Sequence, residues 1–110
     1  MTGPAILDID AHLGALATDA NVTMMLEALL RSSDTDMARL NTAVAAGDTQ
    51  EAGQAAHALA GGAMAAGAPA LAKAARDFEL AAKAGEMPDA APLEAVLAAT
   101  REAALQRMAR

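Results

Sequence analysis

Cysteine is absent from this chain of 110 residues, and Phe78 is its single aromatic residue. Without cysteine the chain has neither a disulfide framework nor a thiolate metal site. Aromatic and β-branched residues, which favour strands, are scarce, whereas alanine, the best helix former, is abundant. These scarcities argue against a disulfide-stapled or sheet-based protein and predict an all-α fold.

Positive charge is also in short supply, because 8 Lys and Arg face 14 Asp and Glu for a net charge of -6. Nucleic acids and anionic membranes are bound by basic surfaces, so we expect neither as a partner. The Ala-rich segment 55–75 contains His57, Pro69 and Lys73 and too few large apolar residues to span a membrane. No basic segment followed by an apolar run opens the chain, so we expect a cytoplasmic protein without an export signal.

Apolar residues recur at steps of three and four along most of the chain, which predicts five helices. Their predicted bounds are Asp8 to Ala17, a cap at Asp19 or Asn21 through to Ala46, a cap at Asp48 or Thr49 to near Gly67, Pro69 to Ala84, and Ala90 toward the C-terminus. The polar segment 32–36 could interrupt the second helix, but the apolar stripe resumes in register after it. All connections are short, so neighbouring helices should be antiparallel. The sequence therefore predicts one domain over residues 1–110, an antiparallel up-down four-helix bundle with a short extra N-terminal helix.

His57 is one of two histidines in the chain, and it lies in the middle of the third predicted helix. At about 100° per residue, an apolar stripe lies opposite it and should face the core: Ala52, Ala55, Leu59, Ala63 and Ala66. The side of the helix around His57 carries small and polar residues: Gln50, Gly53, Gln54, Ala60, Gly61 and Met64. The periodicity thus predicts that His57 points outward, away from the core.

Glycine is unusual on an outward helix face, where charged side chains normally lie. Each of Gly53, Gly61 and Gly62 costs a helix interior about 1 kcal/mol relative to alanine. One interpretation is steric: a partner protein must approach the imidazole, with Gly53, Gly61 and Met64 forming the docking surface. The other is that His57 is an ordinary surface histidine in a chain rich in alanine and glycine.

The residues around and after His57 resemble the signature of the histidine-containing phosphotransfer (HPt) domain family. The matching positions are Ala56, His57, Ala58, Leu59, Gly61, Gly62, Gly67, Leu71, Phe78 and Glu79. The resemblance implies a phosphorelay carrier rather than a stand-alone enzyme, with His57 as the phosphoacceptor and Nε2 as its reacting nitrogen. It also implies response-regulator receiver domains as partners, a hybrid sensor kinase as a further candidate, and a monomeric state. No cofactor is expected on this chain, because the receiver brings the Mg²⁺.

Ala60 departs from the family pattern, which usually has lysine three residues after the histidine. That lysine would lie beside the phosphoryl group, so the candidate phosphate neighbours here are Gln54, Ala60, Gly61 and Lys83. The missing lysine leaves open a second hypothesis, a non-catalytic helical module that binds a receiver or kinase without phosphotransfer. No ATP-binding motif is present and His12 has no metal-ligand spacing to His57, so we expect neither a kinase site nor a metal site.

Overall fold

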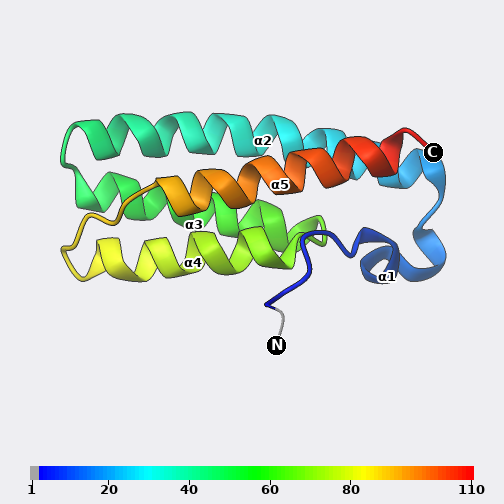
Figure 1. Ribbon diagram of the computed structural model, residues 1–110, viewed down its shortest axis with the longest axis horizontal. Coiled ribbons are helices and arrows are strands. Elements are labelled where there is room, and N and C mark those ends of the chain that lie inside the picture. The colour runs from blue at the N-terminus through cyan, green and yellow to red at the C-terminus, as the bar shows by residue number, and fades with distance from the viewer. Residues whose placement is uncertain (1–2) are drawn as a thin grey trace.

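The computed structural model describes residues 3–110, and this part of the chain consists of helices joined by short connections, without strands (Figure 1). Its elements are α1 (Ile9–Leu13), the 3₁₀ helix η1 (Gly14–Leu16), α2 (Asp19–Ala45), α3 (Thr49–Ala65), α4 (Pro69–Lys83) and α5 (Ala91–Met108). The predicted all-α fold is confirmed. Residues 1 and 2 of the predicted domain lie outside the described residues.

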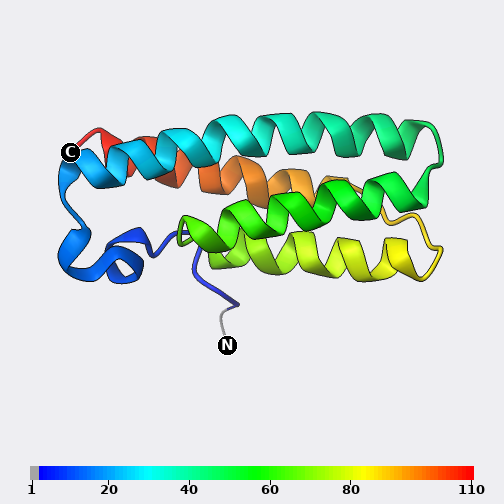
Figure 2. The same ribbon diagram turned by 180° about the vertical axis from the view of Figure 1, so that it is seen from behind.

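The four long helices α2 to α5 lie side by side, and the chain turns back at each of their connections (Figures 1 and 2). α3 packs against both α2 and α4, and α5 contacts α4 and α2. The short α1 lies at the end of the molecule where α3 turns into α4. The amide of Asp8 donates to the carbonyl of Gly67 at 2.8 Å, and the amide of Ala70 donates to that of Ala5 at 2.9 Å.

The start of the chain differs from the sequence prediction. Instead of one helix from Asp8 to Ala17, α1 ends at Leu13 because Gly14 adopts a φ of 56°, and a 3₁₀ turn follows. Thr18 rather than Asp19 or Asn21 caps α2, since its hydroxyl accepts a hydrogen bond from the amide of Asn21 at 3.2 Å. The polar segment 32–36 stays inside α2, so the prediction of one continuous helix is confirmed.

The remaining helix ends lie at or next to the capping and stop residues that the sequence predicts. Asp48 caps α3, with its carboxylate accepting from the amide of Glu51 at 3.0 Å, and Pro69 opens α4. Glycines with φ between 69° and 85° follow α2, α3 and α4: Gly47, Gly67 and Gly85. At Gly67 the glycine is also required by packing, because a Cβ there would lie 3.0 Å from His12 Cβ and 3.1 Å from Ile9 Cα.

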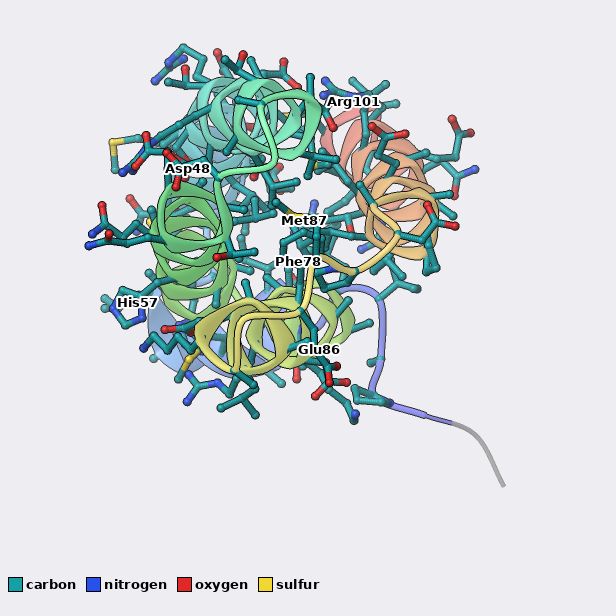
Figure 3. All side chains as sticks on the ribbon, turned by 90° about the vertical axis from the view of Figure 1, so that its left-hand side faces the viewer. Asp48, His57, Phe78, Glu86, Met87 and Arg101 are labelled. Carbon is teal, nitrogen blue, oxygen red and sulfur yellow. The ribbon has the colours of Figure 1, made fainter. Side chains whose placement is uncertain are left out.

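Small side chains dominate the contact between α3 and α4. The buried residues of these two helices are mostly alanines, and a Cβ built on Gly53 would lie 3.5 Å from the Cβ of Ala82. Because the side chains at a contact set the distance between helix axes, this composition lets the two backbones approach closely. Larger residues fill the space among the four helices, and Figure 3 shows Phe78 and Met87 pointing into it. A polar side chain at the edge of the surface of α3 that faces α4 can therefore contact residues of α4.

Arg107 fastens the N-terminal segment to the end of α5. Its guanidinium donates to both carboxylate oxygens of Asp10, at 2.9 and 2.8 Å. The hydrogen bond from Arg107 lowers the pKa of Asp10 below its ordinary value. In the part of the chain that the structure describes, no helix is long and apolar enough to cross a membrane.

Candidate functional site

His57 projects from the middle of α3 into solvent, with 75% of its side chain exposed (Figure 3). The stripe predicted to lie opposite it is buried: Ala52, Ala55, Leu59, Ala63 and Ala66. The predicted outward direction of His57 is therefore confirmed. The side chain is nonetheless held in place, because its ring nitrogen Nδ1 contacts α4.

Glu79 of α4 provides that anchor. Its Oε2 lies 2.9 Å from His57 Nδ1, and only 8% of its side chain is exposed. The pKa of Glu79 lies below its ordinary value, because the hydrogen bond from Lys83 and then that from His57 outweigh the opposing effect of burial. The carboxylate is thus ionised at neutral pH and can only accept a hydrogen bond.

The ionised carboxylate decides which nitrogen of His57 carries the proton. Nδ1 must donate to Glu79, so a neutral imidazole has its lone pair on Nε2. Nε2 makes no hydrogen bond to any residue in the range 3–110. The site therefore presents an oriented nitrogen nucleophile to the solvent.

Lys83 binds the same carboxylate oxygen of Glu79. Its Nζ lies 2.6 Å from Glu79 Oε2, and the two residues are one turn apart on α4. Most of the Lys83 side chain, 63%, is exposed. The structure therefore brings Lys83, named from the sequence as a candidate phosphate neighbour, into one cluster with Glu79 and His57.

Gln54 lies one turn before His57 on the same exposed side of α3. Its side-chain carbonyl accepts from Arg39 of α2 at 3.3 Å, and Arg39 also forms two hydrogen bonds to Glu51, at 2.7 and 2.8 Å. This contact to α2 holds the carbonyl end of the amide, and its NH₂ group makes no hydrogen bond to the described residues. Gln54 is thus a neutral hydrogen-bond donor beside His57.

Two residues expected on the outward face are buried instead. Ala60 is 2% exposed, and Gly53 is buried against Ala82 and Lys83. The expectation was wrong because α4 covers this flank of α3, which periodicity within α3 alone could not reveal. Gly53 still lines the floor of a groove that also contains Gln54 and Lys83. The exposed stripe on α3 is narrower than predicted and comprises Gln50, Gln54, His57, Gly61 and Met64.

Gly61 and Met64 lie on the open side of His57. A Cβ on Gly61 would have no atom within 4 Å among its described surroundings, and Met64 is 53% exposed. Arg76 of α4 reaches over to Met64, where its Nη2 donates to the sulfur at 3.0 Å. Leu80, also on α4, is 63% exposed. The surface beside the imidazole thus has no protruding side chain at Gly61, is partly apolar and has the guanidinium of Arg76 at its edge.

Glu79 is the functional residue to which sequence reasoning assigned no role. It belongs to the matched family pattern, but it lies 22 positions after His57, and no periodicity links two residues on different helices. Arg76 was missed for the same reason. The other histidine is elsewhere: His12 Nε2 lies 3.0 Å from the carbonyl of Ala65, at the turn between α3 and α4. Within residues 3–110 no three His, Cys, Asp or Glu side chains gather as a potential metal site.

The fold and the site together define a class, an all-helical protein that presents one carboxylate-oriented imidazole on an exposed helix face. The family model of the Hpt domain matches residues 24–109, so the chain belongs to the Hpt domain family. Domains of this family are histidine phosphotransfer modules of phosphorelays and interact with receiver domains. No curated protein and no solved structure matches the chain.

Proposed function

We propose that the protein is a phosphorelay intermediate that carries a phosphoryl group on Nε2 of His57. The observation that carries the proposal is the hydrogen bond between His57 Nδ1 and the buried Glu79, which leaves Nε2 as the free nucleophile on a 75% exposed side chain. Histidine is suited to this chemistry because it is neutral and nucleophilic near pH 7.

The transfer has two matched steps. In the first, the Nε2 lone pair attacks the phosphorus of an aspartyl phosphate on a receiver domain. The N–P bond forms, the P–O bond breaks and the receiver's carboxylate leaves. In the second, the aspartate of another receiver attacks the phosphorus, and the imidazole leaves with its lone pair. In the first step Glu79 stabilises the positive charge that the ring acquires, and in the second step it keeps Nδ1 protonated, so that the ring leaves as neutral imidazole.

Phosphoryl transfer depends mainly on positioning and on neutralisation of charge. We expect the receiver to supply the metal, Mg²⁺, and the acidic pocket, whereas this chain supplies the nucleophile. Among the candidate phosphate neighbours, Lys83 and Gln54 bear polar groups near His57, and Gly61 and Met64 form the approach for the receiver. The return of each long helix alongside the previous one supports an antiparallel up-down four-helix bundle. We further propose that the protein acts as a cytoplasmic monomer.

The second candidate is a non-catalytic module that binds a receiver or a sensor kinase without phosphotransfer. One observation favours it: the buried Ala60 occupies the position where the family pattern has lysine. Against it stands the paired Glu79, because a module that only binds has no need of an oriented imidazole. We therefore rank the carrier first.

Incubation with a phosphorylated receiver tests the proposal. The wild-type protein should gain phosphate that is labile to acid and stable to base, as expected for phosphohistidine. His57→Gln should abolish the label, while His12→Gln, which removes the only other histidine, should keep it. Label that persists in His57→Gln, or no label with any cognate receiver, would refute the carrier function.

A further inference from the structure

Oε2 of Glu79 lies within reach of two donors, Nδ1 of His57 at 2.9 Å and Nζ of Lys83 at 2.6 Å. The carboxylate is 8% exposed, so water contributes little to its solvation, and these two groups supply its polar contacts. Lys83 thus holds a positive charge against the carboxylate that orients His57. This arrangement has a consequence once a phosphoryl group is attached to the ring.

A phosphoryl group on Nε2 brings about two negative charges to the ring that Glu79 contacts at Nδ1. The phosphoryl group and the Glu79 carboxylate are both negative and lie at the two nitrogens of one ring, so they repel. The low exposure of Glu79 weakens the screening of this repulsion by solvent. α3 supplies no cation to balance them, because residue 60 is a buried alanine and Gln54 is neutral. Arg39 of α2, which contacts Gln54, is engaged by Glu51. Lys83 is the cation that contacts Glu79.

The charge on Glu79 also affects how easily the phosphoryl group leaves. A phosphorylated ring that keeps its Nδ1 proton releases neutral imidazole. This is a better leaving group than the imidazolate that a ring without that proton would release. A carboxylate without its lysine binds that proton more strongly and therefore favours the labile form. Repulsion and proton retention act in the same direction, so both predict faster loss of phosphate when Lys83 is absent.

We infer that Lys83 is a positioning residue that neutralises Glu79 and thereby prolongs the lifetime of the phosphoryl group on His57. The inference rests on the proposed function only in taking His57 as the phosphoacceptor. It assigns Lys83 a different task from that of a lysine beside the phosphoryl oxygens, because Lys83 acts through the carboxylate. The cation that α3 lacks at Ala60 is in effect provided by the last turn of α4.

Phosphoramidate, a small phosphoryl donor, tests this without a receiver. The Nε2 lone pair forms the N–P bond, the P–N bond of phosphoramidate breaks, and the already protonated leaving nitrogen departs as ammonia. The positive charge left on the ring then faces Glu79. After removal of the reagent, intact-mass spectrometry follows the loss of phosphate from the protein, and His57→Gln identifies the labelled site.

Lys83→Gln should shorten the phosphohistidine lifetime by about two- to fivefold, the range expected for a partly exposed ion pair. Lys83→Arg should restore the wild-type lifetime. Lys73→Gln is the matched control, because Lys73 forms the same type of one-turn ion pair on α4 with Asp77, at 2.8 Å. It should leave the lifetime unchanged, which separates the effect from a general loss of helix charge.

The Glu79→Gln background decides whether Lys83 acts through Glu79. There, Lys83→Gln should have no further effect on the lifetime, since the charge to be neutralised is gone. An unchanged lifetime in the single Lys83→Gln variant, or an equal shortening in the Glu79→Gln background, would overturn the inference. Failure of the wild-type protein to exchange phosphate with receivers would instead refute the proposed relay and leave these lifetimes interpretable.

Discussion

Substitutions at Gly61 should change the stability of α3 and the access of a partner to His57 in opposite directions. A Cβ at this residue would have no atom within 4 Å, so an added methyl group meets only solvent. Replacing glycine by alanine inside a helix stabilises it by about 0.5–1 kcal/mol. For a domain of this size, Gly61→Ala should therefore raise Tm by about 2–8 °C.

Larger side chains at Gly61 should keep the fold and impair docking. Residue 61 lies four positions after His57, so its side chain stands on the same face of α3, about one turn away. Gly61→Gln adds bulk without charge, and Gly61→Glu adds both. We expect both variants to fold at least as stably as wild type but to accept phosphate from a receiver at least about tenfold more slowly, equivalent to ~1.4 kcal/mol of lost docking energy.

Three measurements on the same variants check this reasoning. Thermal unfolding followed by circular dichroism gives the stability, and a time course with a phosphorylated receiver gives the transfer rate. Labelling by phosphoramidate should stay at the wild-type rate in Gly61→Gln, because a small reagent needs no docking surface. Wild-type transfer from the receiver to Gly61→Gln, or a lower Tm for Gly61→Ala, would show that the steric reasoning is wrong.

Gly67→Ala is the contrasting substitution. Gly67 has a φ of 71°, and its added Cβ would lie 3.0 Å from His12 Cβ and 3.1 Å from Ile9 Cα. The left-handed conformation alone costs a residue with a side chain about 1–2 kcal/mol. Two glycines six positions apart should thus respond to the same substitution with changes of opposite sign, which a general preference for alanine would not produce.

Two further predictions concern buried polar groups. The Ser33 hydroxyl is buried and has no hydrogen-bond partner among residues 3–110, so Ser33→Ala should raise the free energy of unfolding by about 1 kcal/mol in urea titrations. Glu79 has a pKa below its ordinary value of 4.5 in the folded protein, so its ion pairs stabilise the fold above that pH and cease to do so as the pH falls through the folded-state pKa. The stability difference between wild type and Glu79→Gln should therefore shrink on acidification below about pH 4.5, and a difference that stays constant down to about pH 2 would contradict the assigned ionisation.

Local patterns predicted most of the helical structure because caps and stop residues act within a few positions of one another. Asp48, Pro69 and Gly85 mark helix ends by their own side chains or backbone preferences, and the structure has helix ends at these places. The exceptions were the first helix, where Gly14 ends α1 early, and the cap of α2, which is Thr18. An apolar spacing that suits a helix also suits a short turn packed on the bundle, so periodicity could not locate the end of α1.

The sequence by itself determined the helical class, the family and the outward direction of His57, since composition, residue spacing along the chain and helical periodicity can all be read without knowing how the helices pack. The tertiary structure alone decided what the imidazole touches. Glu79 and Lys83 lie 22 and 26 positions away. Glu79 contacts His57, and Lys83 contacts Glu79, only because alanine-rich faces let α4 pack closely on α3. The same packing buries Ala60 and Gly53. A contact between helices depends on how two surfaces fit, and that fit is not encoded in the periodicity of either helix.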